Sequence, residues 1–325
     1  MILPQSYRCG GACDASGRNV ANPRPASPAP VPLLCRVMVG VIIMTAFAGT
    51  LRAGAILIPN GSFESPQTTY ATNRIDSWQQ TPDSAFFLTG VFSNQPPVID
   101  NCDGNQAAFL FANPGVSLAQ DYDSTDWSSP IPSHAFNATF NLGSAYSLTV
   151  GVIGGVYGSP PLYIGATLQI SLYYRDAASN MVTVAAATIT NSTGLFPTNT
   201  HFVDFSVQVP GVLPTDLWAN QTIGVQMAST VGTNLASGYW DLDNVRLTET
   251  VLPHLTNPQI MSNHFSLTVC SEPGLQFEIL AHTNLASPLS AWTSLGIVTN
   301  VSGTNAFSDP ATNLNHRFYT LRQLP

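Results

Sequence analysis

Short runs of alternating apolar and polar residues fill most of the chain after residue 55, and turn-forming residues bound each run. Alternation with a period of two places every second side chain on one face of a strand, and no segment shows the 3.6-residue period of an amphipathic helix. The pattern predicts eight strands of about five to nine residues, at residues 107–112, 135–142, 146–153, 167–174, 182–189, 201–209, 222–227 and 239–248. This number of strands within residues 56–250 predicts an all-β fold, a two-sheet jelly-roll sandwich.

The pattern of alternating apolar and polar residues is interrupted around two prolines, Pro253 and Pro258, and residues 251–258 are predicted to be a linker. Four further alternating runs follow, at residues 265–269, 275–280, 292–298 and 317–322. They predict a small second β domain over residues 259–325. This domain resembles a terminal β-module of many secreted bacterial proteins, in which a closing Phe-Tyr-x-Leu strand recurs, here Phe318-Tyr-Thr-Leu321.

The first 55 residues read as a leader that contains a secretory signal peptide. Arg36 precedes an apolar run at residues 37–48, and the small residues Ala53, Gly54 and Ala55 follow it. A basic flank, a short apolar centre and an Ala-x-Ala site are the parts of a signal peptide. A membrane anchor is the alternative, although a spanning helix needs roughly 20 apolar residues. We therefore expect cleavage near Ala53–Ala55, a secreted or cell-surface protein, and no stable membrane span in the mature chain.

Composition suits an extracellular β-protein and argues against nucleic acid as a partner. Charged residues make up 9% of the chain, and lysine is absent. After residue 55, five arginines stand against 17 acidic residues, a balance of 5 − 17 = −12. A surface of this charge repels phosphate backbones and suits neutral polymers or cations. Cleavage would leave Cys102 and Cys270, which fall in different predicted domains and are expected to be free thiols.

The run Gly238–Thr250 places carboxylates in a strand that is otherwise alternating. Side chains two positions apart share a face, which groups Tyr239, Asp241, Asp243, Val245 and Leu247. Two aspartates on an apolar face are costly unless a cation, a proton or a polar ligand neutralises them. The alternative is a strand end that is simply solvated.

A second motif, Asn60-Gly-Ser-Phe-Glu64, lies near the start of the predicted sandwich. Together with the last-strand motif Asp243-Asn-Val-Arg-Leu247, it resembles the terminal strands of secreted bacterial jelly rolls of the galactose-binding type, which include many carbohydrate-binding modules. The resemblance implies that the terminal strands are neighbours and that a structural Ca²⁺ is held by Asn60, Glu64 and Asp243. Carboxylates and main-chain carbonyls are the hard oxygen ligands that Ca²⁺ takes. The alternative is that Glu64 only closes a turn.

Common catalytic motifs are missing from the sequence, which has no Gly-x-Ser-x-Gly elbow, no His-Glu-x-x-His and no phosphate loop. A fainter, collinear likeness to the calcium-dependent hapalindole-type (Stig) indole-alkaloid cyclases runs through residues 60–66, Trp78, 103–112, 117–120, 145–150 and 242–248. The likeness implies a general acid at Asp241 or Asp243, and a pocket lined by Phe109 and Phe111. Those cyclases have tyrosines in the strand that holds Phe109, so the phenolic hydroxyls are missing here.

Three functions remain open from the sequence. The leading hypothesis is a secreted, calcium-stabilised module that binds glycan or another extracellular polymer without turnover. The alternatives are a cyclase-like enzyme that uses Asp241, and a purely structural surface protein without a pocket. Sugars stack on exposed aromatic rings, and the candidate contacts are Trp78, Trp127, Tyr157, Tyr163 and Trp240, for each of which packing in the core is the alternative. A small apolar or aromatic ligand in an enclosed cavity ending at Asp241 would favour the cyclase-like hypothesis.

Overall fold

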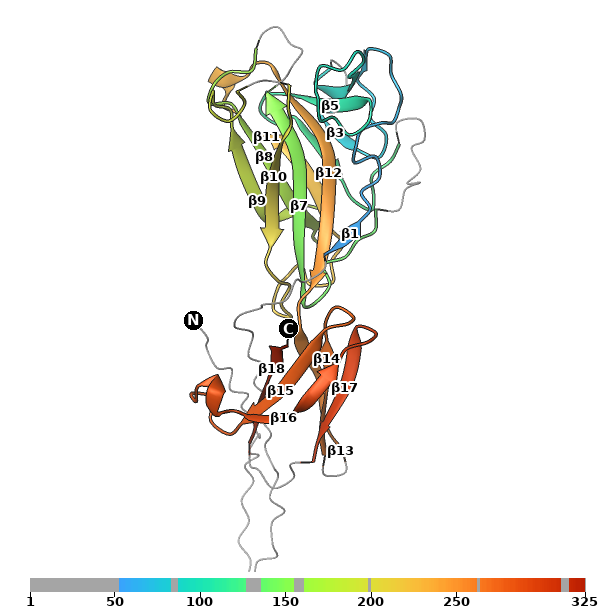
Figure 1. The fold of residues 1–325 in the computed structure, drawn as a ribbon. Helices are drawn as coiled ribbons and strands as arrows, with labels where there is room; N and C mark the ends of the chain where they lie inside the picture. Colours follow the sequence, from blue (N-terminus) through green and yellow to red (C-terminus); the bar gives the residue numbers. More distant parts are fainter. Residues whose placement is uncertain are drawn as a thin grey trace, which may run out of the picture. The chain divides into compact units, whose positions relative to one another are not determined.

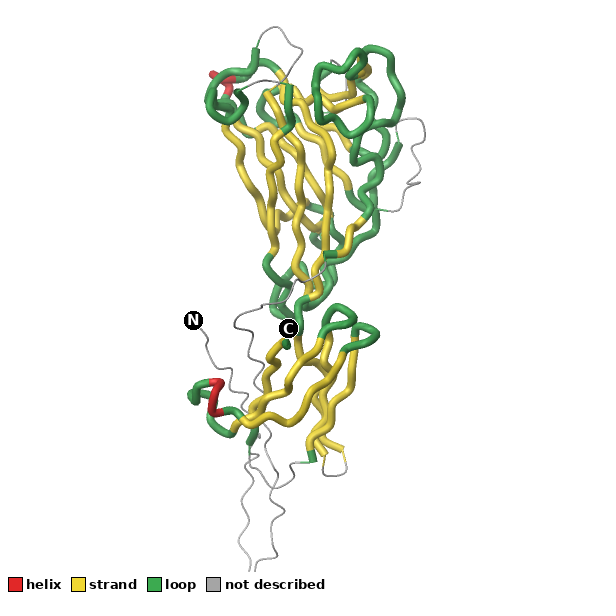
Figure 2. Tube along the Cα trace, in the orientation of Figure 1, coloured by secondary structure: helices red, strands yellow, loops and turns green. Residues whose placement is uncertain are grey.

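The computed structural model describes residues 53–82, 87–126, 136–154, 161–197, 200–261, 264–310 and 316–324. Antiparallel strands dominate these residues, and the only helical elements among them are two short 3₁₀ turns, Thr233–Leu235 and Leu289–Ala291 (Figures 1 and 2). The all-β prediction is confirmed. Within the same residues, no helix is both long and apolar enough to span a membrane. The predicted signal segment, residues 37–48, lies outside the described part of the chain.

Two antiparallel sheets form the jelly-roll sandwich (Figure 1). The seven-stranded sheet has the order β10-β7-β12-β5-β4-β2, and β1 also pairs with β12. Its strands are β1 (Gly54–Ile56), β2 (Ala71–Thr72), β4 (Thr89–Ser93), β5 (Gln106–Phe111), β7 (Ser144–Gly154), β10 (Val203–Val209) and β12 (Tyr239–Val251). The pairing of β1 with β12 confirms that the terminal strands of the sandwich are neighbours.

The five-stranded sheet has the order β3-β6-β11-β8-β9. Its strands are β3 (Gln79–Thr81), β6 (Ser117–Gln120), β8 (Thr167–Arg175), β9 (Met181–Thr190) and β11 (Gly224–Ser229). Every second residue of β8 (Leu168, Ile170 and Leu172) is buried and belongs to one hydrophobic cluster with Trp240 and Leu242 of β12. The inner faces of the two sheets therefore form one core, as the period-two pattern predicts.

A β-bulge in β12 changes which side chains share a face. Asp243 pairs with Gly151 of β7, and Arg246 pairs with Thr149, so three steps on β12 match two on β7. Asn244 adopts a left-handed φ of 52° at this point, which Asn tolerates better than most residues. Tyr239, Asp241 and Asp243 therefore share the outer face, whereas Val245 and Leu247 point into the core with Trp240 and Leu242. The prediction that all five alternate residues share a face is wrong after Asp243.

The second domain has two three-stranded sheets, β13-β14-β17 and β16-β15-β18. The strands are β13 (His254–Met261), β14 (His264–Cys270), β15 (Gln276–His282), β16 (Thr293–Thr299), β17 (Thr304–Asp309) and β18 (Phe318–Gln323). Its core is a hydrophobic cluster separate from that of the sandwich, and Phe265 stacks on Tyr319 with ring centroids 4.5 Å apart. The predicted small β domain is therefore present.

Two expectations about local structure need correction. Residues 136–142, the described part of the strand predicted at 135–142, form only an isolated bridge between Thr139 and Thr222. Most of the segment predicted as a linker, residues 251–258, is strand, because β12 continues to Val251 and β13 begins at His254. Pro258 does not prevent strand formation here, since it lies at a register shift of β13.

Candidate functional site

The register between β5 and β12 brings aromatic and acidic side chains together on the outer face of the seven-stranded sheet. Asp241 pairs with Phe109, and Tyr239 pairs with Phe111. On the next strand, Gly90 of β4 pairs with Phe109, so Phe92 reaches the same face two residues further along. Three neighbouring strands thus contribute to one patch.

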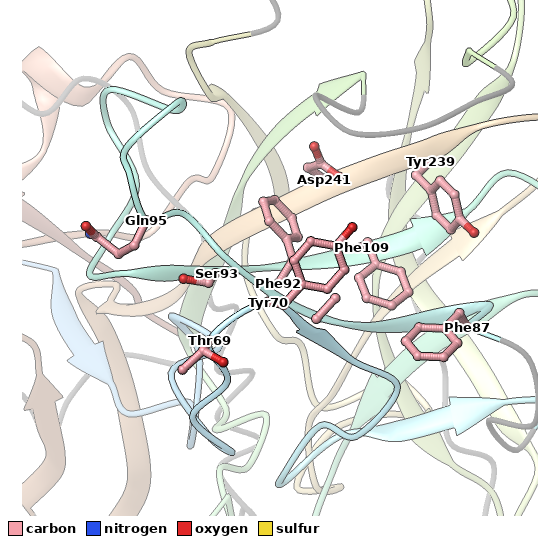
Figure 3. A pocket seen from close by; sticks show the side chains of 10 residues that line it. Thr69, Tyr70, Phe87, Phe92, Ser93, Gln95, Phe109, Tyr239 and Asp241 are labelled. Carbon is pink, nitrogen blue, oxygen red and sulfur yellow. The ribbon is translucent and has the colours of Figure 1, made fainter.

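A pocket of about 450 Å³ opens within this patch. It is called the aromatic pocket below and is lined by Thr69, Tyr70, Ala71, Phe87, Phe92, Ser93, Gln95, Phe109, Tyr239 and Asp241. In Figure 3 the side chains of Tyr70, Phe92 and Phe109 gather at the centre, Phe87 and Tyr239 lie to one side, and Asp241 lies on β12 beyond the rings. A volume of this size and an apolar lining with few polar groups are typical of small-ligand sites.

The rings of the pocket present differently oriented faces. Tyr239 meets Phe109 edge-on, with centroids 5.5 Å apart and an interplanar angle of 88°. Phe87 lies nearly parallel to Phe109, at 6.3 Å and 16°. A glycine at position 90 makes room for this arrangement, because a Cβ there would strike the Thr72 carbonyl oxygen and stand 2.4 Å from the Phe109 ring. Phe111 lies 5.0 Å from Tyr239 and supports that ring from behind the lining.

Polar chemistry in the aromatic pocket centres on Asp241. The residue is only 2% exposed, although its strand neighbour Tyr239 is half-buried. Burial raises the pKa of the Tyr239 hydroxyl, so Tyr239 acts as a neutral hydrogen-bonding group at neutral pH. Asp241 is the only charged residue among the lining residues that the structure describes. The pocket can therefore surround a flat apolar body with rings and meet one polar group of it with a carboxylate.

A second cluster lies around the loop Cys102–Gln106 and includes the predicted calcium ligands. Glu64 Oε1 accepts hydrogen bonds from the backbone N–H groups of Asn105 and Gln106, both at 2.8 Å. Asp243 Oδ2 accepts one from Asp103 N–H at 2.6 Å. Two carboxylates from distant parts of the sequence therefore converge on one loop, as the predicted site requires.

Asp243 is fully buried, and burial raises its pKa from 3.8 to about 7, although backbone N–H groups of Asp103 and Asn244 oppose the rise. A carboxylate in this state needs a proton or a cation at neutral pH. Nearby, burial first and then Asp243 and Glu64 raise the pKa of the Cys102 thiol. The Cys102 thiol stays protonated and donates to the Gln106 carbonyl at 3.0 Å.

Asn60 does not present its side chain to this cluster. Its Oδ1 accepts from Ser65 N–H at 3.0 Å, and its Nδ2 donates to the carbonyls of Ser65 and Asp76. Asn60 therefore shapes the turn that precedes Glu64. In the part of the chain that the structure describes, no group of three His, Cys, Asp or Glu side chains could hold a metal ion. Of the three predicted calcium ligands, only the Glu64 and Asp243 carboxylates reach the loop Cys102–Gln106, whereas the Asn60 amide is engaged within its own turn.

The predicted aromatic contacts separate into three groups. Trp78 and Trp240 are buried in the core, and Trp78 Nε1 donates to the Asn60 carbonyl at 3.1 Å, which corrects the expectation that these rings face a ligand. Tyr163 is 44% exposed and lies outside the lining of the aromatic pocket. Trp127 and Tyr157 lie outside the described residues. Of the predicted contacts, the structure places Phe109 in the lining and Phe111 beside it.

Several lining residues were missed in the sequence. Tyr70 and Phe87 stand in segments without alternation, and Phe92 belongs to a run too short to stand out. The available signal was Gly90 within Thr-Gly-Val-Phe, because a glycine inside a strand often marks a place where another group approaches closely.

Structures of known proteins resemble the sandwich. A cyclase from Fischerella sp. TAU shares 21% identity, and the match covers 62% of this chain and 99% of that one, with a TM-score of 0.46. A structure of the Stig cyclase Fisc from the same organism, in complex with (3Z)-3-(1-methyl-2-pyrrolidinylidene)-3H-indole, matches with the same identity and score. The CBM22-1–CBM22-2 tandem domain of Paenibacillus barcinonensis Xyn10C shares 11% identity over 86% of this chain and 87% of that one, with a TM-score of 0.35.

Both resemblances expected from the sequence, to Stig-type cyclases and to carbohydrate-binding modules, are therefore matched among solved structures. No protein-family model matches the chain, and no curated protein sequence does. Matches at these identities and TM-scores carry no information about the chemistry of the site, which is inferred from the geometry of the site itself.

Proposed function

We propose that the sandwich is a binding module for a small, flat, mainly apolar ligand, which the aromatic pocket holds against Asp241. The observation that carries this proposal is the gathering of five aromatic side chains around a cavity of about 450 Å³. Further along the same outer face polar side chains are exposed, as in the hydroxyl pair Thr149–Ser206 and the ion pair Arg246–Asp204. A hollow lined by aromatic rings on such a face indicates a binding site.

The shape of the site favours a small ligand over an extended polymer. Two of the three tryptophans expected to contact a sugar, Trp78 and Trp240, are in the core. The rings that do reach the surface surround a pocket, and Tyr70, 85% exposed, stands at its rim. A sugar ring is a second ligand class for the same pocket, because Ser93, Gln95 and Asp241 can accept or donate the hydrogen bonds of hydroxyl groups.

Acid catalysis of the cyclase type is a second candidate function. Asp241 is supported for this role by its burial on the last strand of the sandwich, at an aromatic pocket. A buried carboxylic acid can donate a proton to a ligand when its own protonated form is favoured. The substitution of phenylalanine for the tyrosines expected in β5 removes hydroxyl groups that would orient such a donor, so binding without turnover is the first choice.

Calcium at Glu64 and Asp243 is part of the proposal. The ion would neutralise the two carboxylates and tie the loop Cys102–Gln106 to β12. Its role would be structural, since Asp243 lies outside the lining of the aromatic pocket. Export of the protein, with cleavage near residues 53–55, is also proposed, and N-terminal sequencing of protein recovered from the culture medium tests it.

Binding of indole tests the proposed function directly. Calorimetric titration of the purified protein should show saturable binding, which Phe109→Leu weakens at least about ten-fold by removing the central ring. Tyr163→Leu serves as the matched control, because Tyr163 is an exposed aromatic residue outside the pocket. Xylohexaose is titrated in parallel. Binding of the sugar alone would assign the pocket to glycans, and no binding of either compound would overturn the proposal.

A further inference from the structure

The described lining of the aromatic pocket carries negative charge and no positive charge. Asp241 is the only formal charge among the ten lining residues that the structure describes, these include neither arginine nor histidine, and the whole chain has no lysine. The remaining lining consists of five aromatic residues and four small or amide side chains. A ligand with a carboxylate or phosphate would meet no cationic partner in this lining and would be repelled by Asp241.

The rings add to the negative potential. The face of an aromatic ring carries partial negative charge, and a cation within about 6 Å of a ring centroid is attracted to it. Phe87 and Phe109 are nearly parallel and Tyr239 stands edge-on to Phe109, so the rings do not share one plane. Several rings of differing orientation around one cavity, with a carboxylate on the same face, form a cage for a positively charged group.

The depth of the carboxylate strengthens this preference. Asp241 is 2% exposed, and an ion pair made there is screened little by water. Phe109, directly opposite Asp241 on β5, brings an aromatic ring to the same end of the cavity. A ligand cation would therefore contact the carboxylate and at least one ring together.

We infer that the aromatic pocket takes an organic cation, an ammonium group carried on a flat apolar body, which pairs with Asp241 while the rings enclose it. This inference rests on the proposed function, that the pocket is the ligand site, and it specifies the charge of the ligand. It separates the ligand from neutral sugars and from neutral aromatic compounds of the same shape.

A charge series on one molecular body tests the inference. Tryptamine, tryptophol and indole-3-acetate share the indole ring and carry a positive, a neutral and a negative side group at pH 7. In calorimetric titrations tryptamine should bind about ten-fold more tightly than tryptophol or better, and indole-3-acetate should bind least. Asp241→Asn should reduce the preference for tryptamine over tryptophol to the small part that the rings provide, while tryptophol binding persists.

The outcomes distinguish the two proposals. Equal affinity for all three compounds would overturn the inference and leave the pocket as the ligand site. No binding of any of them, nor of indole, would overturn the proposed function as well. If Asp241→Asn does not fold, the salt dependence of the wild-type protein replaces it. Tryptamine affinity should fall between 50 mM and 500 mM NaCl while tryptophol affinity stays constant, and parallel salt dependence would refute the ion pair.

Discussion

Asp243 makes the stability of the metal-free protein depend on pH in an unusual direction. Its pKa is raised by burial from 3.8 to about 7 in the folded state. An acid whose pKa rises on folding stabilises the fold while it is protonated, and that stabilisation is lost as pH increases through the folded value. The metal-free protein should therefore be most stable below about pH 4 with respect to this group and should lose stability up to pH 8.

The size of the stability change follows from the size of the rise in the pKa of Asp243. Each pKa unit corresponds to about 1.4 kcal/mol, so the full effect approaches about 4 kcal/mol. Between pH 5 and pH 8 the share lost is about 2 to 3 kcal/mol. Bound calcium would stabilise the ionised form and cancel the loss, because a ligand of the folded state adds to its stability.

Urea unfolding with a chelator at pH 5 and pH 8 measures the effect. Asp243→Asn is the perturbation, and the quantity compared is the change in unfolding free energy between the two pH values. The absolute stability of the variant is a poor guide, because an amide cannot accept both backbone N–H bonds, to Asp103 and Asn244, that the carboxylate accepts. The wild-type protein should lose about 2 to 3 kcal/mol more than the variant.

Asp204→Asn is the matched control for this comparison. Asp204 lies on the same sheet, is exposed and pairs with Arg246, so its loss should leave the wild-type pH dependence in place. Adding calcium at pH 8 should restore stability to the wild-type protein and to the Asp204 variant only. Identical pH dependence in the wild-type protein and Asp243→Asn would refute the reasoning, and so would calcium stabilisation that survives in Asp243→Asn.

Five further substitutions, at four positions, test the packing of the sandwich. Gly90→Ala should destabilise the protein by about 2 to 4 kcal/mol in urea unfolding and weaken ligand binding, since the new Cβ would strike the Phe109 ring, and an unchanged midpoint would contradict the close approach. Asp121→Asn should cost about 3 kcal/mol, because Asp121 is buried and accepts from Arg175 and from the Tyr173 hydroxyl, both at 2.7 Å. Tyr173→Phe, which removes one of these bonds, should cost only about 1 kcal/mol, and equal losses in the two variants would argue against a charged network. Asn244→Ala should cost about 1 kcal/mol while Asn244→Gly is nearly neutral, as thermal unfolding would show, because the bulge needs a left-handed residue.

The sandwich could be predicted because one face of each long strand is buried. Leu168, Ile170 and Leu172 alternate with more polar residues, and this alternation is a local property of the sequence. Short strands such as β4 and β6 carry too few residues for a period to emerge. Residues 136–142 show the converse, since apolar alternation was present there and only one bridge formed.

The site was predictable only in part, because register decides which strands meet. Tyr239 and Asp241 could be placed on one face from their spacing, and Phe109 from its strand. Nothing local to the sequence says that β12 pairs with β5 or that β4 brings Phe92 alongside. The bulge at Asn244 is equally invisible in a binary pattern, and it reverses the direction of every side chain that follows it.

Asp241 can serve the pocket as a counter-ion or as an acid, and the two roles need opposite protonation states. Pairing with an ammonium group needs the ionised carboxylate, whereas proton donation needs the neutral acid. A strong preference for tryptamine over tryptophol at neutral pH would therefore count against acid catalysis in the resting protein. The amide in Asp241→Asn has the charge of the protonated acid but cannot give up a proton. If this variant binds neutral ligands more tightly than the wild-type protein does, the native pocket is held in its ionised form, and its chemistry is that of cation recognition.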